Sequence, residues 1–135
     1  MEDLTTVVVS GYFDPLHVGH IEYLDLAKSL GDILVVIVNN DKQAALKKGK
    51  SFMNEQDRLT IVSSLKPVDH VFLSIDEGKD VCKSLAYLRP HVFANGGDRA
   101  NREIPEAKVC DELGIALVDG LGTKIRSSSD YTGLK

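Results

Sequence analysis

The fold is decided by residues 4–38, which read LTTVVVSGYFDPLHVGHIEYLDLAKSLGDILVVIV. The segment Leu4–Val9 is rich in β-branched residues and has no charge, which is typical of a strand covered on both faces. In Val18–Leu30 the apolar residues recur every three positions, and Gly31 suits the position just after a helix. Ile33–Val38 is a second apolar, β-branched run. This order predicts two parallel strands joined by a helix.

The rest of the chain repeats this alternation. Further strands are expected at residues 68–73, 91–94 and 115–118, and further helices at 54–66 (with Ser51 or Asn54 as its cap), at 79–88, and between Pro105 and Gly114. Residues 39–53 are polar and rich in lysine, and we expect a loop with at most one helical turn there. The fold class is therefore α/β, a Rossmann-like doubly wound five-stranded parallel sheet with helices on both faces, in a single domain of residues 1–135.

Composition excludes several classes of function. The 135 residues carry 16 basic and 20 acidic side chains, and a net charge of −4 argues against a nucleic-acid or general polyanion binder. No apolar run is long enough to span a membrane, and the acidic start Met1-Glu2-Asp3 is unlike a signal peptide, so we expect a cytoplasmic protein without membrane contact. Cys82 and Cys110 lie in apolar-periodic segments and are expected to be buried thiols.

The loop after the first strand has the chemistry of an anion site. It carries Gly11, Tyr12, Phe13 and Asp14, and then His17-Val18-Gly19-His20 at the start of the helix. Free amides and the positive dipole end favour a phosphate, Gly19 lets oxygens approach the backbone, and two imidazoles three residues apart share one face. Gly11 is expected to permit the sharp turn off the strand. A helix that merely begins with polar residues is the alternative, and a two-histidine metal site lacks a third ligand at a recognised spacing.

Other loops at the expected carboxyl edge of the sheet also carry polar groups. Residues 42–50 hold four lysines and no acid, which a plain solvated basic loop also explains. The run Asn95-Gly96-Gly97-Asp98 follows the fourth strand and is either a plain turn or a backbone surface for a base or ribose. The serines at 127–129 suit a helix cap, a phosphate site or both.

Taken in order, these motifs resemble the nucleotidyltransferase superfamily with the HxGH signature, and specifically its cytidylyltransferase-like family. The resemblance implies direct transfer of an NMP group from an NTP to a phosphorylated small molecule, with Mg²⁺, release of pyrophosphate and a homodimeric enzyme. It implies that His17 and His20 hold the triphosphate, that Lys47, Lys48 or Lys50 reaches the substrate or α-phosphate, and that Arg58 lies near the phosphates. It assigns nucleotide contacts to the first loop and to Asn95, Gly96, Gly97, Asp98, Arg99, Ser127, Ser128 and Ser129.

The choice of substrate rests on departures from close relatives. The glycerol-phosphate cytidylyltransferases carry Arg-Thr-Glu-Gly before the final hydroxyl run, whereas this chain has Gly122-Thr123-Lys124-Ile125-Arg126. Its Gly96-Gly97-Asp98 is more similar to the heptose-phosphate adenylyltransferases, which favours ATP as the donor and a sugar phosphate as the acceptor. The alternatives are CTP with a polyol or amino-alcohol phosphate, and a catalytically silent nucleotide-binding regulatory module.

Overall fold

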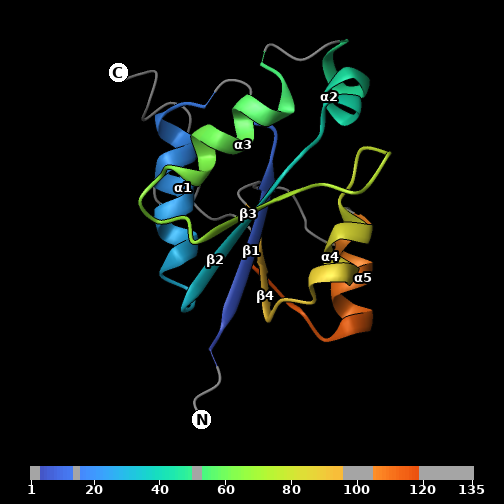
Figure 1. The fold of residues 1–135 in the computed structure, drawn as a ribbon. Coiled ribbons are helices and arrows are strands. Elements are labelled where there is room, and N and C mark those ends of the chain that lie inside the picture. The colour runs from blue at the N-terminus through green and yellow to red at the C-terminus, as the bar shows by residue number, and fades with distance from the viewer. Residues whose placement is uncertain (1–3, 14–15, 50–52, 96–104, 119–135) are drawn as a thin grey trace, which may run out of the picture.

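In a computed structural model of the chain, residues 4–13, 16–49, 53–95 and 105–118 are described (Figure 1). They form a parallel five-stranded sheet of order β3-β2-β1-β4-β5. The strands are β1 (Thr6–Gly11), β2 (Ile33–Val38), β3 (His70–Leu73), β4 (Val92–Ala94) and β5 (Ala116–Val118). The helices are α1 (Val18–Lys28), α2 (Asp41–Lys48), α3 (Glu55–Ser63), α4 (Cys82–Leu88) and α5 (Pro105–Leu113). The predicted α/β, Rossmann-like fold is confirmed.

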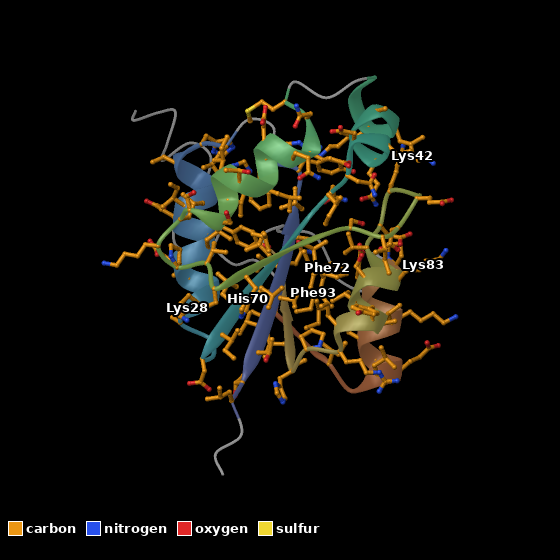
Figure 2. The ribbon with its side chains drawn as sticks, viewed as in Figure 1. Lys28, Lys42, His70, Phe72, Lys83 and Phe93 are labelled. Atoms are coloured by element: carbon orange, nitrogen blue, oxygen red, sulfur yellow. The ribbon has the colours of Figure 1, made fainter. Side chains whose placement is uncertain are left out.

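Alternation along the strands builds a core on each face of the sheet. Val7 and Val9 of β1 pack with Leu24 of α1, whereas Val8 packs with Leu85 of α4 and with Phe93. Figure 1 shows α1 and α3 on one side of the strands and α4 and α5 on the other. In Figure 2 Phe72 and Phe93 lie on the side of α4 and α5. Both faces are therefore covered, which explains why β1 and β2 read as uninterrupted apolar runs.

The prediction of a loop at residues 39–53 is wrong, because this segment contains α2, a helix of eight residues. Asn40 caps it by accepting from the Gln43 amide at 2.8 Å, and the Gln43 side chain accepts in return from the Asn40 amide at 3.2 Å. Gly49 ends it with φ +88°. The helix has no apolar stripe, so its cap residues rather than its periodicity mark it.

Several boundaries differ from the expected ones. Strand β1 begins two residues later than Leu4 and extends to Gly11, and α3 is capped by Asn54 rather than Ser51. Helix α4 begins at Cys82, three residues after the expected start. Gly114, at φ +74°, follows the last residue of α5 as predicted.

The two cysteines are free thiols in different settings. Cys110 is buried as predicted, but Cys82 is only partly buried at the start of α4, so that prediction is wrong. Burial raises the pKa of Cys82 to about 12 and that of Cys110 to about 11. Over the described ranges, no helix is long and apolar enough to cross a membrane.

Candidate active site

The end of β1 and the start of α1 place two histidines side by side. His17 is the N-cap of α1, with extended backbone, and its Nδ1 accepts from the Gly19 amide at 3.1 Å. His20 Nδ1 accepts in turn from the His17 amide at 3.1 Å. The rings are stacked, with centroids 3.9 Å apart and an interplanar angle of 29°. Imidazoles thus take the place of the usual hydroxyl and carboxylate of a capping box.

These two hydrogen bonds fix the tautomers of the rings. A nitrogen that accepts from an amide carries no proton, so each neutral ring holds its proton on Nε2. Burial, with a smaller contribution from the neighbouring His17, lowers the pKa of His20 to about 4. At neutral pH His20 is therefore an uncharged Nε2–H donor at a helix N-terminus, which suits an anion without requiring a proton transfer.

Phe13 supports this pair from below. Its ring is buried, belongs to the core cluster on the α1 side, and meets His20 edge-on at 4.9 Å. Phe13 adopts φ +52°, so the left-handed conformation at this turn falls on Phe13 and not on Gly11. A Cβ on Gly11 would lie 2.8 Å from the Phe13 ring, so close packing, rather than the expected freedom to turn, requires glycine there. With its ring in the core, Phe13 has only its backbone to offer a nucleotide.

Arg58 lies at the centre of the loops, with no exposed surface. Its Nη1 donates to the carbonyls of Tyr12 at 3.0 Å and Asn39 at 2.6 Å, and its Nε donates to the Met53 carbonyl at 2.9 Å. Its Nη2 pairs with the Asp41 carboxylate at 2.7 Å. The guanidinium therefore joins the end of β1, the segment after β2 and the start of α3. The predicted contact of Arg58 with phosphates stays a prediction.

The residues that hold α2 against the sheet edge were not predicted from the sequence. The Asn40 side-chain amide donates to the carbonyls of Ser74 and Asp76, at 3.0 and 2.9 Å. The buried Gln43 donates to the carbonyls of Gly78 and Asp80, at 2.7 and 2.8 Å. The spacing Asn-x-x-Gln after a buried strand was the one signal for this cap.

A cavity of about 420 Å³ opens beside this framework. Strand ends supply Gly11 and Asn95, the N-termini of α4 and α5 supply Val81 and Glu106, and α2 supplies Lys47. Its volume is in the range of small-molecule sites. This is the carboxyl edge of the sheet, where the sequence predicted a ligand.

The Lys47 side chain crosses this edge. Its Nζ lies 4.6 Å from the centre of the Tyr12 ring, a cation–π contact. Burial raises the pKa of the Tyr12 hydroxyl, with a smaller opposing effect of Arg58, so the phenol stays protonated at neutral pH. Lys47 thus lines the cavity from α2, whereas Lys42, labelled on the same helix in Figure 2, does not.

The family model for cytidylyltransferase-like proteins matches residues 8–111, a span that contains the histidine pair, Arg58 and Lys47. The chain belongs to the cytidylyltransferase-like family. Its similar proteins include nucleotidyltransferases, and the chain is a nucleotidyltransferase.

Three relatives and one solved structure illustrate the range of this family. The FAD synthase of Picrophilus torridus is 34% identical over 128 residues, 92% of this chain and 91% of that protein. The FAD synthase of Ferroglobus placidus is 43% identical over 124 residues, 92% and 78% of the two chains. The bifunctional protein HldE of Aliarcobacter butzleri is 38% identical over 120 residues, 87% of this chain but 25% of that protein, so the chain spans a quarter of its length. The crystal structure of the lipopolysaccharide core biosynthesis protein from Thermoplasma volcanium GSS1 has a TM-score of 0.73 and 31% identity, and covers 87% of this chain and 94% of that one.

Part of the predicted site lies outside the described residues. The positions concerned are Asp14, Lys50, Gly96, Gly97, Asp98, Arg99, Ser127, Ser128 and Ser129. Lys48 closes α2, but its side chain is outside the description. Within the described ranges no three acidic, histidine or cysteine side chains gather as a metal site. Mg²⁺ usually binds through substrate phosphates and one or two carboxylates, so the described residues do not make its site alone, and Mg²⁺ stays a prediction.

Proposed function

We propose that this family member transfers AMP from ATP to the phosphate of a phosphorylated small molecule and releases pyrophosphate. The observation that carries the proposal is the stacked pair His17 and His20, whose Nε2–H groups are fixed as donors by bonds at Nδ1. Two such donors at a helix N-terminus offset charge that accumulates on the phosphates as the α-phosphorus changes partner. In this reaction an oxygen of the acceptor phosphate forms a bond to the α-phosphorus of ATP. The bond between the α-phosphorus and the leaving pyrophosphate breaks at the same time. No protein nucleophile is required.

Two acceptors are supported by different observations. Similarity of the Gly-Gly-Asp segment to heptose-phosphate adenylyltransferases supports a sugar phosphate. The FAD synthases match almost the whole chain, and FAD consists of an AMP joined to a flavin mononucleotide, which supports FMN. Both are phosphate monoesters on carbon chains that bear hydroxyls.

The test is pyrophosphate release with ATP, CTP, GTP or UTP, each paired with FMN and with a panel of sugar and polyol phosphates in the presence of Mg²⁺. We expect turnover with ATP and at least one acceptor, and a loss of about 10²-fold in His17→Ala and in His20→Ala. His91→Ala is the matched control, because His91 lies at the opposite end of the sheet, where its Nδ1 accepts from the Thr6 amide. No release with any pair would contradict the proposal, and tight ATP binding without turnover would favour the regulatory module.

A further inference from the structure

The walls of the 420 Å³ cavity differ in charge. The lining includes Lys47 from α2, one of the three lysines that the family resemblance allows near the acceptor or α-phosphate. The lining also includes Asp80 and Glu106, at the start of α4 and of α5. A ligand that fills this cavity therefore meets both positive charge and carboxylate hydrogen-bond acceptors.

The N-terminus of α4 is not available to a phosphate. The first amides of α4 are all taken by carboxylates, at distances of 2.7 to 3.0 Å: Val81 donates to Glu106, Cys82 to Asp80, and Lys83 and Ser84 to Asp76. The helix end that normally attracts an anion is thus already neutralised by protein groups. We therefore expect the phosphate of a ligand to lie near a lysine of the cavity and not at the start of α4.

Glu106 is held in place but keeps hydrogen-bonding capacity. Its Oε2 accepts from the Val81 amide at 3.0 Å, and its Oε1 has no partner among the described residues. An ionised carboxylate only accepts, so the group that it binds must be a donor. Lys79, which precedes Asp80 in the chain, also lines the cavity, and its positive charge disfavours an ammonium ligand and favours a neutral hydroxyl.

We propose that Glu106 selects the acceptor: it binds a hydroxyl of a polyhydroxylated phosphate monoester whose phosphate lies near Lys47. This rests on the proposed function, because it takes the cavity as the acceptor site. Glu106 positions the acceptor chain and discriminates against phosphates without hydroxyls. The class includes both a sugar phosphate and the ribityl phosphate of FMN.

The test compares three five-carbon phosphates by calorimetry, namely ribitol 5-phosphate, pentyl phosphate and 5-aminopentyl phosphate. In the unmodified protein, ribitol 5-phosphate should bind at least about tenfold more tightly than the other two, because a hydrogen bond to a charged group typically changes affinity by that much. Glu106→Gln retains an oxygen for the Val81 amide but places an amide donor in the cavity, and should remove most of this preference.

Glu112→Gln is the matched control, because Glu112 is exposed on the same helix and does not line the cavity. Glu106→Asp keeps the charge but withdraws the carboxylate, so it should lose the preference as well. It provides a second test if Glu106→Gln folds poorly. Equal binding of the three ligands, preference for the amine, or an unchanged preference in a folded Glu106→Gln would each overturn the proposal. Binding is measured without turnover, so a failure of pyrophosphate release, which contradicts the proposed function, is a separate result.

Discussion

Replacement of Arg58 by methionine tests whether this residue positions the loops or contacts the phosphates. Methionine fills much of the same space but removes the Arg58 hydrogen bonds to the carbonyls of Tyr12, Asn39 and Met53 and to the carboxylate of Asp41. A buried acceptor that loses its hydrogen-bond donor costs about 1–3 kcal/mol. Because the Asp41 side chain is 42% exposed and regains water, we expect the lost free energy of unfolding to be about 4 kcal/mol, most of it from the carbonyls.

This magnitude is large enough for a simple assay. An unfolding entropy of about 2.1 cal/mol/K per residue gives roughly 0.28 kcal/mol/K for 135 residues, so the Arg58→Met variant should melt about 14 °C lower. Arg58→Lys keeps the charge but cannot span three carbonyls from one nitrogen, and should recover less than about half of the loss. Urea unfolding followed by circular dichroism gives the free energies directly.

The control is the half-exposed ion pair of Lys28 and Asp69, whose atoms lie 2.6 Å apart. Lys28→Met should cost less than about 1 kcal/mol, because water screens such a pair. If Arg58→Met costs no more than Lys28→Met and yet abolishes pyrophosphate release, Arg58 acts on the phosphates and the positioning role is refuted.

Two further predictions concern the histidine loop. Gly11→Ala should cost about 1–3 kcal/mol and alter the near-ultraviolet circular dichroism, because its Cβ would meet the buried Phe13 ring at 2.8 Å; Gly78→Ala, with nothing within 4 Å, is the control, and equal melting temperatures would contradict the packing argument. His20 has a pKa of about 4 in the fold and 6.5 as its ordinary value, so the unfolded chain binds more protons between these values and stability falls as the pH drops from 6.5 to 4. His20→Gln should lose less stability over this window in urea titrations, and parallel curves for the two proteins would show that burial does not hold the ring neutral.

The sheet and most helices follow from local pattern. Ile33–Val38 was predicted to the residue, because a β-branched apolar run bounded by Gly31-Asp32 and Asn39 has few other structures. Helix α2 was missed because its buried positions are Gln43 and Ala44, and a buried glutamine has no apolar signature. Its partners, the carbonyls of Gly78 and Asp80, lie more than thirty residues away. Only tertiary contacts make that helix face an interior one.

The candidate site was likewise only partly predictable from the sequence. The His17 and His20 pair could be predicted, because a capping position and its third residue are neighbours in any helix. Arg58 was singled out by its motif, but the sequence does not say that its donors go to carbonyls 5, 19 and 46 residues away. Every residue has a backbone carbonyl, so the sequence does not show which carbonyls an arginine will bind. Whether Arg58 is a buried residue that links loops or an exposed phosphate ligand therefore depends on the fold.

Hydrogen bonds of Arg58 and Gln43 connect the histidine pair with the cavity. Arg58 fixes the carbonyl of Tyr12, next to the loop that leads to the histidines, and pairs with Asp41 at the start of α2. The same helix holds the segment before α4 through Gln43 and brings Lys47 to the cavity. A shift of α2 would therefore move Lys47, the segment before α4 that contains Asp80, and the segment at Tyr12 that leads to the histidines together. Residues 42–50 hold four of the chain's positive charges while the remainder sums to −8, so positive charge is concentrated in α2 and the residues just after it, and Lys47 lines the same cavity as Glu106.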